Sequence, residues 1–300
     1  MRALGVLAAA LVVAASCAAP SAMGTPSVSA TPSPTESLAI ASAAPTASAT
    51  PTPAVPHVFV VVMENATLAT AIRFPSVQRL AASYALATNY RAVASPSLPN
   101  YLALTSGSTW DITDDGYHVL PPGGIGLQLT AAGMGWRAYM EGLTDGGCLH
   151  SPYPYALKHN PFAYYGGACP PNVVSLDELD ADLAENTPSF VWITPGLCHD
   201  AHDCSLAVAG PWLEDLVARI VASAAWRNGG VLFIVWDEGG PASSTVPLLV
   251  AAPGLGSQEI TAAYDHYSLL ATIEDLFRLP RIGAARNARA LTDLLPRSTR

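Results

Sequence analysis

The sequence has little charge, no basic stripe interleaved with aromatic residues, and no apolar run that comfortably spans a bilayer. Only 12% of its 300 residues are charged, and the formal net charge is -9. The lack of a basic, aromatic-bearing stripe argues against a nucleic-acid partner. The apolar run at residues 3–16 is shorter than a membrane span. No internal repeat is evident along the chain.

The N-terminus has the pattern of a bacterial export signal. Arg2 precedes the apolar residues 3–16, and Ala14-Ala15-Ser16 lead to Cys17. This predicts a signal peptide over residues 1–17 and export of the chain. Cys17 stands where a lipoprotein signal has its lipidated cysteine, which predicts attachment to a membrane surface through Cys17. Ala14 replaces the usual leucine, so ordinary cleavage and secretion stay open.

Residues 18–56 consist mostly of Pro, Ser, Thr and Ala, with Glu36 as their single charge. Such a segment buries too little apolar surface to offset the entropy of ordering. It is therefore predicted to be a disordered linker. The remaining residues, 57–300, are enough for one sizeable domain.

Four cysteines follow Cys17, an even number that indicates two disulfides in an exported chain. Three connectivities are possible, and proximity along the chain favours Cys148–Cys169 and Cys198–Cys204. The alternative is a zinc site with the ligands Cys198, His199, His202 and Cys204.

Apolar runs alternate with amphipathic segments in the folded part. The runs at 57–63 and 231–236 are rich in β-branched residues and typical of strands buried on both faces of a parallel sheet. Further strands are predicted at 136–140, 189–194 and 246–251, and helices around 74–86, after Ser97, at 124–133, 175–185, 213–221 and 266–277. Residues 141–172 are predicted to form a long functional loop. The alternation predicts an α/β fold with a doubly wound, mostly parallel sheet and helices on both faces.

Polar side chains follow several predicted strands at their carboxyl ends, where such sheets bind ligands. These residues are Glu64, Asn65, Asp200, His202, Asp203, Asp237 and Glu238. Converging acids repel one another unless their charge is compensated, most simply by one or two divalent metal ions. Carboxylates and imidazoles suit zinc, manganese, iron or calcium, and the sequence does not choose among them.

Ser97 lies in a loop that leads into a predicted helix. Pro96 and Pro99 stiffen this loop, and Pro99 fits a first helical turn. Ser97 is then expected just ahead of the helix N-terminus, where N–H groups and the helix dipole stabilise an anion. This setting suits an activated nucleophile on phosphate, and a neighbouring metal would lower the pKa of its hydroxyl.

Other side chains are candidates for binding the phosphoryl group. Asn65 and Asn100 are predicted hydrogen-bond donors to it. Lys158 and His159, in the 141–172 loop, are a candidate cation and a candidate proton donor.

Each of these features also has a plainer explanation. Ser97 can be only a helix N-cap, and Glu64 only a cap partner. The segment 237–240 can be a turn, and the segment 200–203 a solvated loop. His266, which follows Asp265, can simply open a helix.

Six short motifs occur in the order found in a known family. They are Met63-Glu64-Asn65, Ser97-Leu98-Pro99-Asn100-Tyr101, Lys158-His159-Asn160-Pro161, His199-Asp200-Ala201-His202-Asp203-Cys204, Trp236-Asp237-Glu238 and His266-Tyr267. Together they resemble the bacterial phosphoesterase family of secreted acid phosphatases and phospholipases C, in the alkaline-phosphatase-like superfamily. The resemblance covers roughly residues 57–290 and is strongest to small secreted acid phosphatases that act on phosphoinositides. It implies a phosphoesterase catalytic domain over residues 57–300.

The resemblance implies metal-assisted phosphoryl transfer through a phosphoserine on Ser97, with Asn100 contacting the phosphate. The metal group near the nucleophile corresponds to Glu64, Asn65, Asp237 and Glu238. A second acidic and histidine cluster corresponds to Asp200, His202, Asp203 and His266. The spacing after Asp200 departs from the common Asp-x-x-x-His form. One metal ion, with His202 and His266 contacting phosphate directly, is equally consistent.

The leading hypothesis is an exported, metal-dependent acid phosphatase for phosphate monoesters, including phosphatidylinositol phosphates. The chain is short for a phospholipase C of this family, which favours a monoesterase, and a phospholipase C-type phosphodiesterase is the alternative. A non-catalytic phosphate-binding protein of the cell surface is an alternative of another class. Six of the 14 basic residues lie in the segment 278–300, either as a solvated face or to draw the domain to anionic headgroups.

Overall fold

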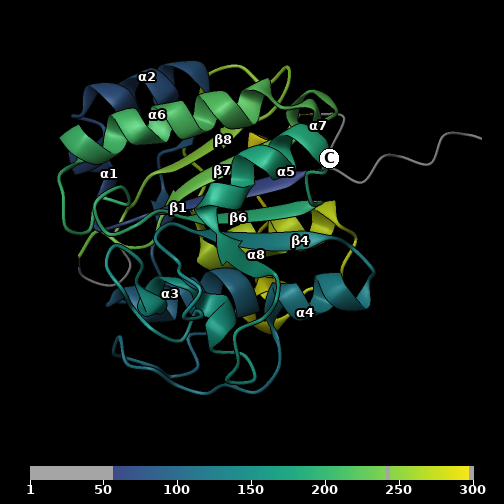
Figure 1. Ribbon diagram of the computed structural model, residues 1–300. Coiled ribbons are helices and arrows are strands. Elements are labelled where there is room, and N and C mark those ends of the chain that lie inside the picture. The colour runs from purple at the N-terminus through teal and green to yellow at the C-terminus, as the bar shows by residue number, and fades with distance from the viewer. Residues whose placement is uncertain (1–56, 241–243, 297–300) are drawn as a thin grey trace, which may run out of the picture. The chain divides into compact units, whose positions relative to one another are not determined.

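The computed structural model describes residues 57–240 and 244–296 (Figure 1). The predicted signal peptide (1–17) and linker (18–56) lie outside the described residues. Within the described part, no helix is both long and apolar enough to cross a membrane.

The core is an eight-stranded sheet, in which β1 lies at the centre between β6 and β7. In spatial order the strands are β5 (Val173–Ser175), β4 (Trp136–Met140), β6 (Phe190–Thr194), β1 (Val58–Met63), β7 (Val231–Trp236), β8 (Leu248–Ala251), β2 (Ala85–Ala87) and β9 (Gln258–Ile260). A small second sheet pairs β3 (Tyr90–Arg91) with β10 (Tyr264–Asp265) in parallel.

Most of the pairings in the large sheet are parallel, and the two exceptions both involve β8. Strand β1 runs parallel to β6 and to β7, whereas β8 runs antiparallel to β7 and to β2. Every residue of β1 and β7 is buried. Strands covered on both faces need apolar side chains on both faces, which explains the unbroken apolar runs.

Helices cover both faces of this sheet. Figure 1 shows α2 and α6 on one side, near α5 and α7, and α3, α4 and α8 on the other. The helices are α1 (Leu68–Ala71), α2 (Pro75–Ser83), α3 (Ser97–Ser106), α4 (Gly124–Ala131), α5 (Leu179–Glu185), α6 (Leu206–Ala222), α7 (Ala224–Arg227) and α8 (His266–Leu276). Short 3-10 turns occur at Leu157–His159, Pro161–Ala163, Leu176–Glu178, Gly283–Asn287 and Thr292–Leu294. The predicted α/β, doubly wound fold is confirmed.

Two predicted helices are too long at one end. The helix predicted over 74–86 ends at Ser83, and residues 85–87 form β2, which pairs with β8 and β9. The helix predicted over 175–185 begins as a 3-10 turn after β5. In both cases strand pairing with distant segments overrides the local helical pattern, as tertiary contacts commonly do.

A buried carboxyl group of α8, outside the polar cluster at the strand ends, binds the segment that follows this helix. Glu274 is fully buried, and its Oε1 accepts a hydrogen bond from the Ile282 N–H at 2.9 Å. Its Oε2 and the neighbouring Gln128 Oε1 are buried acceptors without a donor among the described residues. Burial raises the pKa of Glu274 to about 7. Glu274 therefore keeps its proton to a higher pH in the folded protein than in the unfolded chain.

We expect Glu274→Gln to flatten the pH dependence of stability. The folded-state pKa of Glu274, about 7, exceeds its ordinary value of 4.5. The folded protein therefore binds the proton more tightly, and stability falls as pH rises from about 4.5 to about 7. A glutamine keeps its N–H hydrogens at every pH. Measured between pH 5 and 8, the melting temperature of Glu274→Gln should rise relative to that of the wild type as the pH increases. Parallel curves would contradict this assignment.

Candidate active site

Ser97 is the first residue of α3, and its hydroxyl points into the protein. Its N-cap is Pro96, and Pro99 lies in the first turn. The Ser97 side chain is 2% exposed and makes no capping bond. Instead Ser97 Oγ donates to Glu64 Oε2 at 2.9 Å. The explanation of Ser97 as merely a helix cap is therefore excluded.

Glu64 follows β1 and is fully buried. Its second oxygen, Oε1, accepts a 2.6 Å hydrogen bond from the hydroxyl of Tyr101, one turn along α3 from the serine. Burial, together with the charges of Asp237 and Asp200, holds the pKa of Glu64 well above its usual value. Among the described residues, all hydrogen-bond donors to the Glu64 carboxylate are side chains, so Glu64 is not a helix cap either.

Asp237 follows β7, the neighbour of β1, and its backbone N–H donates to the Met63 carbonyl at 2.9 Å. Asp237 Oδ1 accepts from the Asn65 N–H at 3.2 Å, while Oδ2 is buried without a hydrogen-bond partner among the described residues. Burial and the adjacent Glu238 raise the pKa of Asp237 to about 7, and the nearby Ser97 hydroxyl opposes this shift. Ser97 thus lies between two buried acids at adjacent strand ends.

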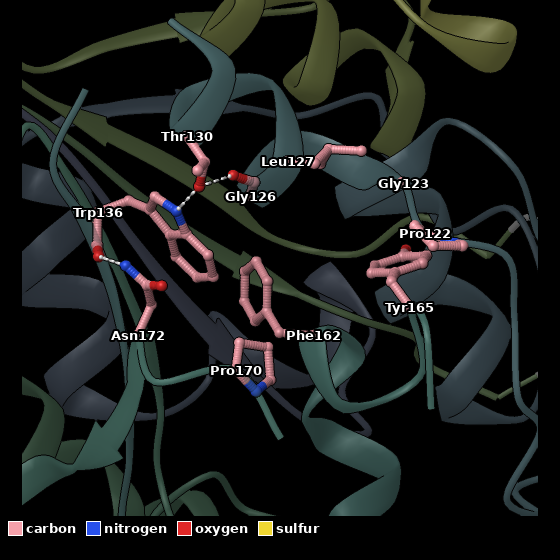
Figure 2. A pocket seen from close by; sticks show the side chains of 10 residues that line it. All are labelled: Pro122, Gly123, Gly126, Leu127, Thr130, Trp136, Phe162, Tyr165, Pro170 and Asn172. Atoms are coloured by element: carbon pink, nitrogen blue, oxygen red, sulfur yellow. Dashed lines mark hydrogen bonds between the residues drawn. The ribbon is translucent and has the colours of Figure 1, made fainter. Parts of the chain in front are cut away.

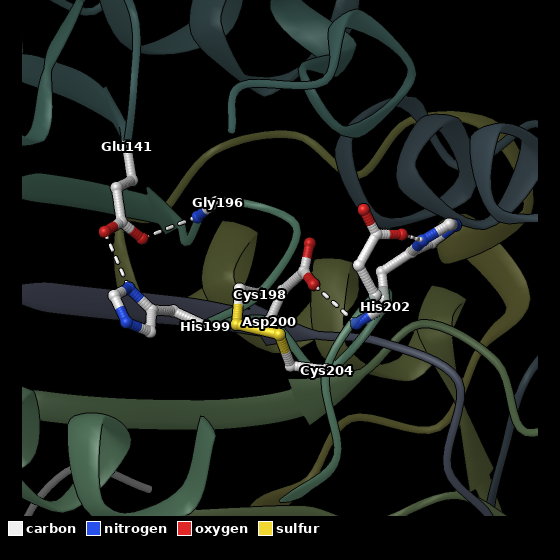
Figure 3. Close-up of a disulfide and its surroundings, with 8 residues drawn as sticks. Glu141, Gly196, Cys198, His199, Asp200, His202 and Cys204 are labelled. Atoms are coloured by element: carbon white, nitrogen blue, oxygen red, sulfur yellow. Dashed lines mark hydrogen bonds and ion pairs between the residues drawn. A yellow bond between two sulfur atoms is a disulfide. The ribbon is translucent and has the colours of Figure 1, made fainter. Parts of the chain in front are cut away.

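The loop after β6 is closed by the disulfide Cys198–Cys204 (Figure 3), and Cys148–Cys169 forms the second bridge. Both predicted pairings are confirmed, and the alternative zinc site of Cys198 and Cys204 is excluded. Asp200, inside the bridged loop, is fully buried, and burial raises its pKa to about 7.

Glu141 fixes the start of this loop. Its carboxylate accepts from the Gly196 N–H and contacts His199 Nδ1, each at 2.7 Å (Figure 3). The His199 ring stacks on Trp212 with centroids 5.0 Å apart. These contacts orient the segment that presents Asp200 to the site.

His159 lies between the two acidic loops. Its Nε2 is 3.3 Å from Glu64 Oε1, and its Nδ1 is 3.2 Å from Asp200 Oδ2. The ring stacks on Tyr101 at 5.2 Å and 9°. Burial and the charge of Lys158 hold the pKa of His159 well below its usual value. Burial thus disfavours the protonated form of the His159 imidazole inside the site.

His202 lies at the outer side of this cluster. Its Nδ1 contacts Asp203 Oδ1 at 2.7 Å, and its Nε2 is 3.0 Å from Lys158 Nζ. The same ammonium pairs with Asp115 Oδ2 at 2.9 Å. Asp115 was missed by the sequence reasoning, because Asp114-Asp115-Gly116 has only the composition of an ordinary turn.

Three predicted site residues have other surroundings. Asn100 is saturated by backbone groups: its Oδ1 accepts from the N–H groups of residues 93 and 94, and its Nδ2 donates to the carbonyls of residues 94 and 96. The nitrogens of His266 bond Tyr90 Oη at 2.9 Å and the Asp237 carbonyl at 2.6 Å. Asn65 has an exposed side chain and φ 53. Asn100 therefore has no free side-chain atom for the predicted phosphate contact. His266 likewise has no free ring nitrogen for the predicted ligand role.

The donor set of the cluster fits a divalent metal. Ligand atoms of Glu64, His159 and His202 all lie within 4.8 Å of one another. Within the described ranges, buried atoms without a hydrogen-bond partner gather in the same cluster: both ring nitrogens of His159, Asp200 Oδ2, Asp237 Oδ2 and Glu238 Oε2. Buried lone pairs without donors are what a bound cation satisfies.

A different, apolar pocket of about 190 Å³ lies elsewhere (Figure 2). It includes Trp136, the first residue of β4, and Asn172, which immediately precedes β5. It therefore borders the amino-terminal ends of these strands, whereas the acids follow carboxyl ends. No acidic, basic or histidine side chain lines it. It is not part of the candidate active site.

Solved structures share this fold at low sequence identity. The fold superposes on a protein of the alkaline phosphatase superfamily from Vibrio parahaemolyticus with a TM-score of 0.58 at 11% identity, covering 81% of this chain and 71% of that one. A lipoteichoic acid synthase from Listeria monocytogenes gives a TM-score of 0.54 at 11% identity, covering 79% and 77%. The chain therefore shares its fold with these proteins.

The sequence defines the family more closely. Residues 70–280 match the phosphoesterase family, and the chain belongs to it. It is 31% identical over 256 residues to the phosphatidylinositol-3-phosphatase of Mycobacterium tuberculosis, covering 81% of this chain and 83% of that protein. It is 27% identical to a probable acid phosphatase of Kluyveromyces lactis, covering 75% of this chain and 59% of that one. The predicted resemblance is confirmed, and the protein is a hydrolase of phosphoric esters.

We expect Asn100→Ala to destabilise the protein, because it leaves two part-buried backbone N–H groups and two carbonyls without their partner. The free energy of unfolding should fall by about 3 kcal/mol, measured by urea denaturation. The exposed Asn228→Ala is the control and should change it by less than about 0.5 kcal/mol. Full stability with lost activity would instead support the phosphate contact predicted for Asn100.

Proposed function

We propose that this protein is an exported, metal-dependent phosphatase that hydrolyses phosphate monoesters through a phosphoserine on Ser97. One observation carries the proposal: the buried Ser97 hydroxyl donates to Glu64 at 2.9 Å, at the start of a helix and beside Asp237. The names of the relatives support monoester hydrolysis, since they are a phosphatidylinositol-3-phosphatase and acid phosphatases.

The chain's own residues account for activation of the nucleophile. Glu64 Oε2 holds the Ser97 hydroxyl hydrogen, so the oxygen lone pairs face away from the carboxylate. The Tyr101 hydroxyl binds the other oxygen of Glu64 at 2.6 Å and fixes the carboxylate plane. Attack of Ser97 Oγ on phosphorus releases the alcohol, and water then hydrolyses the phosphoserine.

The acids and histidines around Ser97 would hold the metal. The candidate ligands nearest the serine are Glu64, Asp237 and Glu238, and His159 and His202 extend the set. A divalent cation such as zinc, manganese, iron or calcium, once bound, would polarise a phosphoryl oxygen and lower the pKa of the serine. His266 and Asn100 then serve as positioning residues, because their polar atoms bind neighbouring loops.

Phosphatidylinositol phosphates are the proposed physiological substrates. The support is the name of the Mycobacterium tuberculosis relative, most of whose length this chain covers. Lys158 lies at the outer side of the site, where its ammonium can donate a hydrogen bond to the substrate. Export, with or without lipidation of Cys17, stays a proposal that rests on the N-terminal sequence.

Ser97→Ala should lower kcat for p-nitrophenyl phosphate by about a thousandfold or more, because no other hydroxyl replaces the nucleophile. Ser106→Ala is the control, since it removes a buried hydroxyl at the other end of α3. Circular dichroism should show both variants folded. Full activity of Ser97→Ala would rule out the nucleophile, and faster release from bis-p-nitrophenyl phosphate than from the monoester would favour the phosphodiesterase alternative.

Metal removal should abolish activity reversibly. Dialysis against EDTA should remove both bound metal, measured by inductively coupled plasma mass spectrometry, and monoester hydrolysis, and one of the divalent ions should restore both. Asp237→Asn should retain far less metal than the wild type, because it removes a buried charge from the ligand set. The exposed Asp145→Asn is the matched control and should keep its metal. A metal-free protein with full activity would contradict metal dependence.

A further inference from the structure

A second pocket adjoins the candidate active site on the side of Lys158. Its volume is about 290 Å³, and Tyr117, Tyr164 and His202 also line it. The rings of the two tyrosines lie 5.2 Å apart at 52°. On the function proposed above, this second pocket is the space for the part of the substrate next to the phosphate, which in a phosphoinositide is the inositol headgroup.

Two chain segments connect the second pocket to the apolar pocket of Figure 2. They lie side by side, because the Leu120 N–H donates to the Tyr164 carbonyl at 2.9 Å. In the first segment, Tyr117 lines the second pocket and Pro122 lines the apolar pocket. In the other segment, Tyr164 and Tyr165 are divided between the two pockets in the same way. Since Pro122 is five residues from Tyr117, their Cα atoms are at most about 18 Å apart.

Large apolar side chains are exposed along this connection. Val119, between Tyr117 and Pro122 in sequence, is 66% exposed, and Tyr117 itself is 43% exposed. Leu127 of α4, which lines the apolar pocket, is 51% exposed. A Cβ added at Gly167 would lie 2.7 Å from Val119 Cγ1, so the valine packs on the neighbouring segment. Large apolar side chains that gather on a surface are typical of sites that bind an apolar partner or ligand.

The apolar pocket itself suits a hydrocarbon group. Its volume is about 190 Å³, and every residue that lines it is uncharged. Trp136 Nε1 donates to Thr130 Oγ1 at 2.9 Å, and Asn172 Nδ2 donates to the Trp136 carbonyl at 2.8 Å (Figure 2). These polar groups are thus bonded within the wall, where the rings of Trp136 and Phe162 lie 5.0 Å apart. An apolar cavity of about 150 Å³ accepts a benzene ring, so this pocket holds a group of about six carbons.

We propose that the apolar pocket binds one acyl chain of a phosphoinositide whose headgroup lies in the second pocket. This inference rests on the proposed function, which takes phosphatidylinositol phosphates as substrates. A ligand that begins beside Lys158 and ends beside Trp136 needs a polar end and a hydrocarbon end. An acyl chain that fills one leaflet is about 15 Å long, half the hydrocarbon core of a bilayer, so chain and headgroup together cover the distance.

Two soluble substrates with the same headgroup test this inference. Dibutanoyl and dioctanoyl phosphatidylinositol 3-phosphate differ only in acyl-chain length, and both are used below their critical micelle concentrations. Each buried methylene group is worth about fourfold in affinity. With two of the four additional methylene groups of one chain buried, the wild type should prefer the dioctanoyl ester by about fifteenfold in kcat/KM, chiefly through KM.

Variants at the rim of the apolar pocket locate the chain. Leu127→Ser removes a half-exposed leucine, whose covering by the chain is worth about fivefold, so the preference should fall to about threefold. Leu127→Met should keep most of the preference, because methionine has a similar volume. Val208→Ser is the matched control, since Val208 is 50% exposed on α6, on the opposite face of the sheet (Figure 1). It should leave the preference at about fifteenfold.

Calorimetry gives a readout that is independent of hydrolysis. The probes are dibutanoyl and dioctanoyl phosphatidylinositol, the dephosphorylated forms of the two substrates. The wild type should bind the dioctanoyl lipid about fifteenfold more tightly, and Leu127→Ser about threefold more tightly, for the same reason as above.

The outcomes distinguish this inference from the proposed function. Equal kcat/KM for the two lipids in the wild type overturns the acyl-chain pocket while monoester hydrolysis stands. A preference that Leu127→Ser leaves unchanged, or that Val208→Ser lowers equally, also overturns it. Weaker binding of Leu127→Ser to phosphatidylcholine vesicles, with an unchanged preference, would show a bilayer contact instead and reject the pocket. If neither lipid is hydrolysed, the proposed substrate fails, and the calorimetry alone decides the acyl-chain pocket.

Discussion

The site depends on three carboxylates, Glu64, Asp200 and Asp237, that are buried together. Burial raises the pKa of each of them, and the negative charges of neighbouring acids add to the shift. Such a group is costly in a folded protein unless donors or cations compensate it. The hydroxyls of Ser97 and Tyr101 supply part of that compensation, and they come from one helix. The same hydrogen bond that stabilises the Glu64 carboxylate also places the serine.

The fold holds these carboxylates together through its most buried elements. β1 and β7 are adjacent, parallel and in register from Val58 to Met63, so the residues that follow them meet at one edge. The backbone of Glu64 donates to the Asp200 carbonyl at 2.8 Å, which ties in the bridged loop. Asn100 binds the segment before Ser97 from within α3. Backbone hydrogen bonds therefore hold the segments of Glu64, Asp200 and Asp237 next to one another.

Buried apolar runs made the central strands predictable. The strands at 136–140 and 231–236 have the predicted bounds. For the strand at 231–236 the reason is that a strand covered on both faces is apolar throughout. The gathering of acids also followed from sequence, since carboxyl ends of parallel strands share an edge. Strand β2 was not predictable, because its three residues owe their conformation to pairing with β8 and β9.

The roles of single side chains depended on contacts that no local pattern records. Asp115 and Lys158 are 43 residues apart, and their pairing arises only when two loops meet. Tyr101 was visible only as part of a motif, and its bond to Glu64 requires the register between α3 and β1. His266 matched a family motif, yet its ring nitrogens are occupied by Tyr90 and a backbone carbonyl. Motifs therefore located the site, whereas packing decided what each residue does in it.

The central claim is that the Ser97 hydroxyl attacks the phosphoryl group from its position beside Glu64. The most direct measurement is mass spectrometry of protein quenched in acid during turnover of a monoester. The account predicts one phosphoryl group on the peptide that contains Ser97. A Ser97 peptide without a phosphoryl group at every quench time, while the monoester is being turned over, would contradict it.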